Sequence, residues 1–167
     1  HMIRKGIQDN DPVICLENEI LYNQEFDLDT EEEFDIGTAK IEKEGGDLTI
    51  VSYSFGVHKA LEAAEILKEQ GISAEVINIR SLRPLDKETI VKSVIKTGKL
   101  ITVEEGWHQS GVCAEIIAVI VKNAFDFLDA PPLRFSGEDI PLPYAENLEK
   151  LALPNTDNIL QECLEIL

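Results

Sequence analysis

The sequence has little of what a metal-binding or disulfide-linked protein needs. Its 167 residues include only three cysteines, which are Cys15, Cys113 and Cys163. They lie far apart and form no CxxC pair, so neither a zinc site nor a disulfide framework is indicated. Cys15 falls in a strand-like run, and the other two fall in apolar helical stretches. We therefore predict three buried, reduced thiols in a reducing compartment.

Basic residues are scarce as well. The chain carries 15 lysines and arginines against 32 acidic residues, a formal net charge of −17 at pH 7. Such a surface does not suit a nucleic acid or an anionic membrane, and we expect neither as a partner. Solubility alone or a basic partner would each explain the charge. No apolar run reaches the roughly 18 residues of a membrane-spanning helix, and no signal-peptide pattern is present.

The strongest pattern that is present is an alternation of strand-like and helical runs between residues 47 and 106. Strand runs are expected at 47–54, 74–79 and 100–104, and helices at 57–70 and 84–98. Gly71 and Gly98 end the helices, and Asp86 is placed to cap the second helix. The strands are apolar on both faces, which is typical of a parallel sheet covered by helices on each side.

Further elements complete the expected fold. Residues 36–42 suggest an edge strand, 133–136 a short strand, and 112–128 a helix apolar nearly all round and hence deeply packed. Residues 137–154 look largely irregular. Asn155 or Thr156 caps a last helix, whose apolar stripe consists of Ile159, Leu160, Cys163, Leu164 and Leu167. We predict an α/β fold, a three-layer α/β/α arrangement around a mostly parallel five-stranded sheet.

The first 35 residues do not look like the start of this domain. His1-Met2 has the appearance of a tag remnant. Residues 3–23, with a turn and a strand run at 12–17, resemble the end of an upstream domain. Residues 24–35 form an acidic linker that we expect to be exposed. The domain itself is expected to span residues 36–167.

No sequence motif identifies an active site. GxGxxG, GxxxxGK[ST] and GxSxG are all absent. A phosphorylated receiver domain is excluded because the third strand run ends in Glu104-Glu105 rather than in the required aspartate.

Several side chains still leave a functional and a structural interpretation open. His58 is either a base at a strand end or a helix-surface residue, and His108 either lines a pocket or lies in an interface loop. The pair Glu104-Glu105 offers two metal ligands with no third nearby. Arg80 and Arg83 either bind an anion or belong to an ordinary strand-to-helix loop.

Longer strings carry a family resemblance. The relevant segments are DLTIVSYSFGVHKALEAAEIL (47–67), GISAEVINIRSLRPLDKETIVKSVIKTGKLITVEEGW (71–107), SGVCAEI (110–116), FDFLDAP (125–131) and DIPLPYAENLEKLALP (139–154). Together they resemble the transketolase C-terminal domain, most closely that of pyruvate dehydrogenase first-component β subunits. The segment DNDPVICLENEILY (9–22) resembles the last part of the pyrimidine-binding domain of those subunits.

The resemblance implies membership of an α2β2 enzyme that uses thiamine diphosphate and magnesium. Such an enzyme decarboxylates pyruvate and passes the acetyl group to a lipoyl arm, in the bacterial cytoplasm or the mitochondrial matrix. Its known catalytic residues lie in the pyrimidine-binding domain upstream of Ile3. We therefore assign no catalytic residue to this chain and expect no turnover by it alone.

Two sites of the family map onto this sequence. The family's structural potassium ion would be held by Gly6, Ile7, Asp9 and Asp11, although Asn is common where Asp11 stands. The peripheral subunit-binding domain of dihydrolipoamide acetyltransferase would dock against Asp129 and the carboxylate of Leu167 at the β–β two-fold axis. The alternatives are the same domain of a branched-chain 2-oxoacid or acetoin dehydrogenase, and a stand-alone interaction module.

Overall fold

A single five-stranded sheet organises the chain. The computed structural model describes residues 2–23, 25 and 34–167. The strand order is β1-β3-β2-β4-β5, in which β1 is antiparallel to β3 and every other neighbouring pair is parallel. The strands are β1 (Lys40–Lys43), β2 (Leu48–Ser52), β3 (Ala74–Asn78), β4 (Leu100–Trp107) and β5 (Leu133–Gly137). The predicted five-stranded, mostly parallel sheet is confirmed, and β1 carries a register shift between Ile41 and Lys43.

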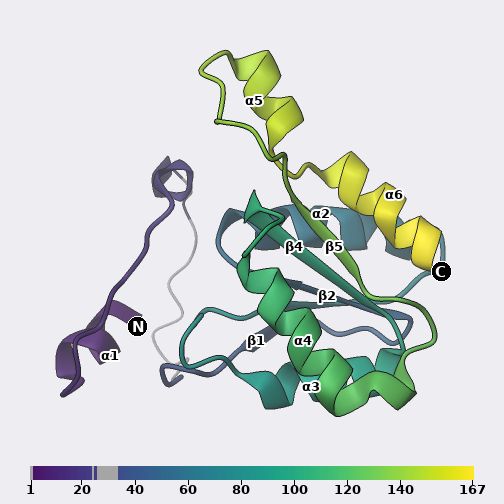
Figure 1. Cartoon of the computed structure of the whole chain (residues 1–167), viewed down its shortest axis with the longest axis horizontal. Coiled ribbons are helices and arrows are strands. Elements are labelled where there is room, and N and C mark those ends of the chain that lie inside the picture. The colour runs from purple at the N-terminus through teal and green to yellow at the C-terminus, as the bar shows by residue number, and fades with distance from the viewer. Residues whose placement is uncertain (1, 24, 26–33) are drawn as a thin grey trace.

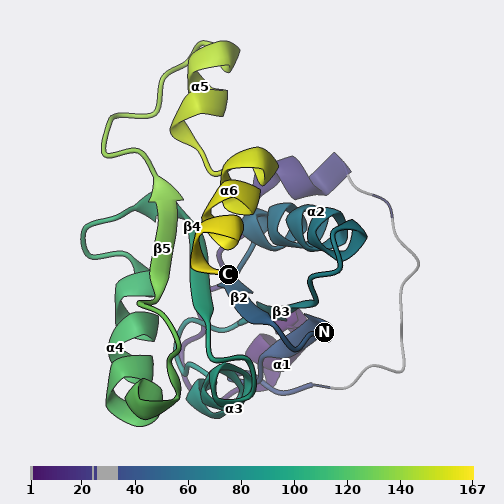
Figure 2. The same ribbon diagram turned by 90° about the vertical axis from the view of Figure 1, so that its right-hand side faces the viewer.

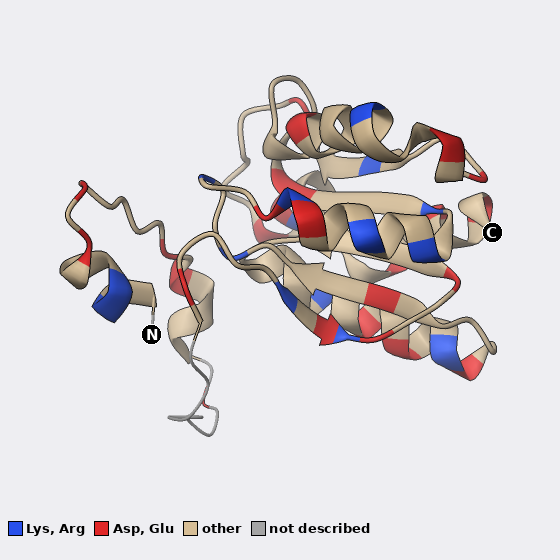
Figure 3. Ribbon diagram, turned by 90° about the horizontal axis from the view of Figure 1, so that it is seen from below, with Lys and Arg blue, Asp and Glu red and all other residues tan. Residues whose placement is uncertain are grey.

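Helices cover both faces of the sheet. Figures 1 and 2 show α2 (Phe55–Glu69) and α6 (Thr156–Ile166) on one face, and α3 (Lys87–Thr97) and α4 (Val112–Ala124) on the other. Each interface has its own hydrophobic cluster, one under α2 and α6 and one under α3 and α4. The central strand β2 carries no charged residue, whereas Figure 3 shows charged residues on the helices and on the edge strand β1. The predicted three-layer α/β/α arrangement is confirmed.

The helix ends follow the local signals in the sequence. The Asp86 side chain accepts a hydrogen bond from the Thr89 backbone N–H at 3.1 Å and caps α3. The Asn155 side chain does the same for α6, accepting from the Asn158 N–H at 3.0 Å. Gly98 ends α3 with a φ of 70°, a left-handed conformation that glycine adopts without strain.

A polar contact is buried between the sheet and α3. Glu75 on β3 is 1% exposed and forms an ion pair with Lys96, whose side chain is partly exposed. Burial alone would raise the pKa of Glu75, but hydrogen bonds from Lys96 and Ser93 hold it below its usual value. Nearby, the Thr49 hydroxyl lies 2.6 Å from that of Ser93 and 2.7 Å from that of Thr97. These pairings satisfy the Thr49 hydroxyl and one carboxylate oxygen of Glu75, whereas Glu75 Oε1 has no hydrogen-bond partner among the described residues.

The segment before the domain departs from the prediction. Residues 12–17 form no strand, and Cys15 is exposed, so the expectation of three buried thiols was wrong for this one. A strand needs a neighbour to satisfy its backbone groups, and the described residues place none beside 12–17. The segment does contain two short helices, α1 (Met2–Gln8) and η1 (Glu19–Asn23). Most of the expected acidic linker, residues 24 and 26–33, lies outside the described residues.

The helix at 112–128 was predicted too long and too deeply buried. It ends at Ala124 and is followed by the short 3-10 helix η2 (Phe125–Phe127). Its inner side packs in the core, but Val121, Phe125 and Phe127 are 46–65% exposed, because no other described element covers this side. No helix of the described residues is long and apolar enough to cross a membrane.

The C-terminal part holds two further differences. Residues 137–154 contain a helix, α5 (Glu146–Ala152), which neighbouring prolines conceal in the sequence. The last helix buries Ile159, Cys163 and Ile166, which follow the spacing of one helical face. Leu164 and Leu167, which we expected in that stripe, are instead about half exposed. Strand β4 is also longer than expected and absorbs the start of the predicted polar loop at 104–111.

The ion pair under α3 leads to a stability prediction. Lys96→Met keeps most of the side-chain stem but leaves the buried Glu75 carboxylate without its cationic partner. We expect a loss of about 2–3 kcal/mol in the free energy of unfolding at pH 7, measured by urea denaturation. The matched control is Lys92→Met on the same helix, which breaks an exposed pair with Glu88 at 2.6 Å and should cost less than about 0.5 kcal/mol.

The stabilisation from the Glu75–Lys96 ion pair should depend on pH. Because the pKa of Glu75 is lowered in the folded protein, the stabilisation is present above the ordinary value of 4.5 and is lost as the pH falls through the folded-state pKa. The difference between wild type and Lys96→Met should therefore shrink below about pH 4. An equal loss in both lysine variants at pH 7 would contradict the assignment.

Candidate functional site

Polar side chains gather where β4 and β5 end, at the carboxyl edge of the sheet. Glu104 and Glu105 are successive residues of β4, so their side chains point to opposite faces. Glu104 is directed toward the start of α4, and Glu105 toward η1, where it accepts a hydrogen bond from the Asn18 side chain at 3.1 Å. The structure therefore separates the two carboxylates that we considered as a metal-binding pair.

Glu104 anchors the N-terminus of α4. Its side chain is 1% exposed, and Oε2 accepts a hydrogen bond from the Cys113 backbone N–H at 3.3 Å. Oε1 lies 3.5 Å from Nη2 of Arg134 on β5. A carboxylate at a helix N-terminus satisfies free N–H groups and interacts favourably with the helix dipole. Glu104 thus joins β4, β5 and α4, and its position indicates a structural role.

Two groups beside Glu104, the Tyr53 hydroxyl and the Cys113 thiol, are neutral at physiological pH. Burial, with a contribution from the Glu104 charge, raises the pKa of the Tyr53 hydroxyl. Burial likewise raises the pKa of the Cys113 thiol to about 12. A thiol with such a pKa is not a thiolate at pH 7, so Cys113 lacks the activation that a catalytic cysteine needs.

The histidines and arginines for which two interpretations were open make local contacts in the structure. His108 Nδ1 lies 3.2 Å from the Ser136 hydroxyl, and its carbonyl accepts a hydrogen bond from Arg134. His58 lies in the first turns of α2, 6.2 Å from the Phe55 ring centre. Arg80 donates to the Thr38 carbonyl at 3.2 Å, so it fixes the segment that leads into β1.

The other candidate groups also form no catalytic cluster. Arg83 is exposed in the loop before α3 and precedes a cis proline. In the part of the chain that the structure describes, no cluster of three or more His, Cys, Asp or Glu side chains could hold a metal ion.

Asp129 and Leu167 lie at the opposite, amino edge of the sheet. The Asp129 backbone N–H donates to the Gly98 carbonyl at 2.8 Å, just before β4 begins. Its neighbour Ala130 packs against the same hydrophobic cluster as Ile166 at the end of α6. Figure 1 shows the C-terminus at the end of the sheet where β5 starts. Two residues 38 positions apart in the sequence are thereby brought to one edge.

The four residues of the expected potassium site lie in and just after α1. Gly6 and Ile7 belong to its last turn, where backbone carbonyls lack helical partners. Asp9 and Asp11 follow in a tight turn, in which Asp9 Oδ1 accepts a hydrogen bond from the Asp11 N–H at 2.9 Å. The segment thus carries backbone carbonyls and carboxylates, the oxygen ligands that a hard cation prefers, close together in the sequence.

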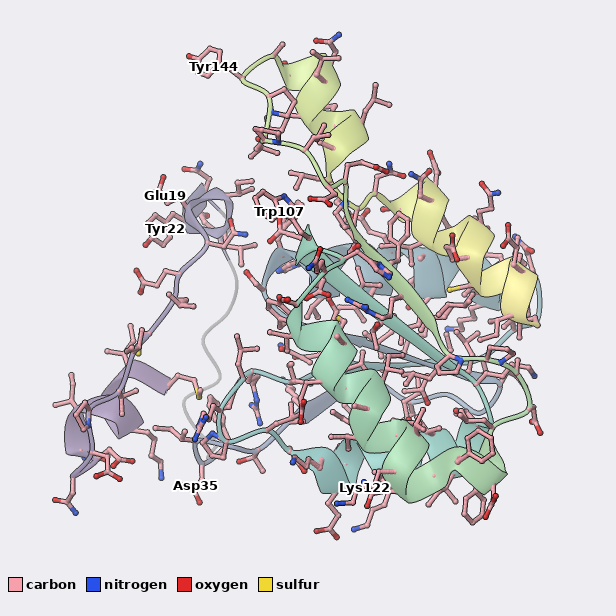
Figure 4. The ribbon with its side chains drawn as sticks, in the orientation of Figure 1. Glu19, Tyr22, Asp35, Trp107, Lys122 and Tyr144 are labelled. Atoms are coloured by element: carbon pink, nitrogen blue, oxygen red, sulfur yellow. The ribbon has the colours of Figure 1, made fainter. Side chains whose placement is uncertain are left out.

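A groove, which we call the η1–α5 groove, opens beside Glu105. It has a volume of about 360 Å³ and is lined by Ile20, Glu105, Gly106, Trp107, Glu138, Ile140, Leu142, Glu149, Ala152 and Leu153. Figure 4 shows Trp107 at the tip of β4, between η1 and the arm that carries α5. No sequence pattern marks this groove, because its walls come from three separate segments.

A family model and several known proteins match most of this chain. A family model described as "Transketolase, C-terminal domain" matches residues 37–159. The chain is 54% identical over 164 residues to "Pyruvate dehydrogenase E1 component subunit beta, mitochondrial" of Dictyostelium discoideum, covering 95% of this chain and 46% of that protein. It is 52% identical to "Pyruvate dehydrogenase E1 component subunit beta" of Rickettsia bellii, covering 93% and 48%. The chain thus spans about half the length of the curated relatives it matches.

Solved structures agree at the level of the fold. A structure titled "Split gene transketolase, inactive beta4 tetramer" superposes with a TM-score of 0.71 at 27% identity, over 83% of this chain and 44% of that one. A 2-oxoglutarate:ferredoxin oxidoreductase from Magnetococcus marinus superposes with a TM-score of 0.53 at 16% identity, which shows likeness of fold alone.

The anchoring of α4 by Glu104 can be tested at Gly111, the residue that precedes the helix. A Cβ atom at Gly111 would overlap the Glu104 carboxylate, which is buried and cannot move into solvent. We expect Gly111→Ala to lower the free energy of unfolding by about 1–3 kcal/mol in urea denaturation. Gly106→Ala is the control, because open space surrounds its Cβ position, and its effect should stay within about 0.5 kcal/mol. Equal effects of the two substitutions would argue against the close contact at Glu104.

Proposed function

Because this chain belongs to the family of transketolase C-terminal domains, we propose that it is the C-terminal domain of the β subunit of pyruvate dehydrogenase. That enzyme decarboxylates pyruvate with thiamine diphosphate and transfers the acetyl group to lipoyl groups, toward acetyl-CoA. The observation that carries the proposal is identity above 50% to subunits of that name over more than nine-tenths of this chain. The corresponding location is the bacterial cytoplasm or the mitochondrial matrix.

Within that enzyme, the role we assign to this domain is association rather than chemistry. Its partners would be an α subunit and a second β subunit in an α2β2 assembly. The support is exposed apolar residues: Val121 at the end of α4 and Phe125 and Phe127 in η2 are 46–65% exposed within seven residues of the sequence. Large apolar side chains that gather on a surface in this way are typical of a protein interface. Thiamine diphosphate and magnesium are assigned to the full enzyme, and no step of the reaction is assigned to residues of this chain.

The proposed role includes docking to the acetyltransferase. Asp129 is exposed at the amino edge of the sheet, and the Leu167 carboxylate ends α6 at the same edge. Two acidic groups on one edge suit a basic partner, because complementary charges speed and orient association. We assign this edge to the peripheral subunit-binding domain of dihydrolipoamide acetyltransferase.

A potassium ion near α1 is the second part of the proposal. The carbonyl groups of Gly6 and Ile7 and the carboxylates of Asp9 and Asp11 lie at the end of α1 and in the turn that follows it. Potassium prefers such uncharged and charged oxygen ligands, and its role would be to hold this turn in place. A further ligand would come from the pyrimidine-binding domain.

The docking assignment predicts a specific binding result. In a calorimetric titration, the subunit-binding domain should bind this chain, and added salt should weaken the binding because the contact is electrostatic. Asp129→Ala should weaken it about tenfold, equivalent to roughly 1.4 kcal/mol. Asp139→Ala is the matched control, since it removes the same charge beyond the opposite end of β5 and should leave the affinity unchanged. Absence of binding at any salt concentration would count against docking by this chain.

The substrate assignment needs the assembled enzyme. With the matching α subunit and the full β subunit, steady-state rates should favour pyruvate over branched-chain 2-oxoacids and acetoin in kcat/KM. The isolated chain should show no turnover with any of them. A preference for a branched-chain substrate or for acetoin would move the protein to the corresponding dehydrogenase. Failure of the chain to associate with any α subunit would favour a stand-alone interaction module.

A further inference from the structure

The η1–α5 groove combines two kinds of surface that rarely remain uncovered together. Its walls include four large apolar side chains that are 47–59% exposed, namely Ile20, Trp107, Ile140 and Leu142. Three carboxylates, those of Glu105, Glu138 and Glu149, open onto the same groove. None of the described residues that line it is lysine or arginine. The groove is therefore both apolar and uniformly negative.

The three carboxylates differ in their contacts and in the elements that carry them. Glu105 accepts a hydrogen bond from Asn18, and burial raises its pKa, so this site already disfavours negative charge. Glu138 follows the end of β5, and Glu149 lies on α5, so they approach the groove from two different elements. A cation at the groove would interact favourably with the Glu138 and Glu149 carboxylates.

The apolar surface continues beyond the groove. Tyr144, Leu148 and Leu151 are 105%, 49% and 72% exposed, in the loop before α5 and on α5 itself. Figure 1 shows this arm projecting from the body of the domain, and Figure 4 shows Tyr144 at its tip, directed away from the rest of the chain. A small cation would interact with the carboxylates but leave this apolar surface exposed to water. A protein segment covers both, which favours a macromolecular partner.

We propose that the η1–α5 groove docks a basic, amphipathic segment of a partner protein. Apolar residues of that segment cover Trp107, Ile140 and Leu142, and its lysine or arginine side chains pair with Glu138 and Glu149. Long basic side chains suit the site because their methylene stems pack on apolar walls while their charged ends reach the carboxylates. The groove lies at the carboxyl edge of the sheet, away from Asp129 and Leu167, so the inference does not rest on the proposed acetyltransferase docking.

Trp107 makes the proposal directly measurable, because it is the single tryptophan of the chain and lines the groove. The probe is an amphipathic Leu/Lys helical peptide of roughly 14 residues without tryptophan, titrated into the whole chain. We expect saturable binding, a shift of Trp107 emission to shorter wavelength as its ring leaves water, and weaker binding as salt rises from about 0.05 to 0.5 M.

Matched double variants separate the groove from the overall negative charge. Glu138→Gln with Glu149→Gln should weaken binding at least about fivefold and reduce its salt dependence. Glu69→Gln with Asp126→Asn removes the same charge from exposed positions at the end of α2 and in η2, and should leave the affinity within about twofold. Unchanged circular dichroism spectra would show that all four substitutions leave the fold intact.

Three results would overturn the proposal. Equal weakening by the two double variants would mean that the peptide responds only to the net charge of −17. Equally tight binding of a Leu/Glu peptide of the same length would mean that the groove carboxylates do not favour basic over acidic side chains. Saturation of the Trp107 signal by arginine amide at the same affinity would indicate a small-cation site instead. The calorimetric result with Asp129→Ala is independent of all three.

Discussion

The complete burial of β2 is the constraint on which the rest of the domain depends. All five residues of this strand, Leu48–Ser52, are buried, so it can exist only with helices packed on both faces of the sheet. Its polar side chains must also find partners: Thr49 pairs with hydroxyls of α3, and the Ser52 hydroxyl donates to the Val103 carbonyl at 2.9 Å. The positions of α2, α3 and the neighbouring strands follow from these requirements, because unpaired buried polar groups are costly.

This constraint also explains where partners can approach. With both faces of the sheet occupied by helices, the accessible chemistry lies at the two ends of the strands. The amino end carries Asp129 and Leu167, and the carboxyl end carries Trp107 and the carboxylates of the η1–α5 groove. Both ends are acidic, which accords with the net charge of −17. The domain therefore presents two separated negative surfaces on one rigid sheet.

Local features were predictable from the sequence, whereas contacts between distant segments were not. Asp86, Gly98 and Asn155 act on residues three or four positions away, so their capping roles could be recognised in the chain. The strand at 12–17 and the deep burial of Phe125 were predicted wrongly, because each depends on what lies alongside in space. Hydrophobicity indicates that a side chain will be covered somewhere, but it does not say by which element.

The same distinction applies to the candidate sites. Glu104 could be singled out from its position at a strand end, but its contact with Arg134, thirty residues away, arises only through the pairing of β4 with β5. The η1–α5 groove has no sequence signature, since η1, the end of β4 and the segment of residues 138–153 together form its walls. The antiparallel edge strand β1 has a separate consequence. Its register shift and its two lysines, Lys40 and Lys43, make it a poor template for strand addition. The domain can thus expose apolar helical surfaces for assembly while its β1 edge resists the addition of strands from other chains.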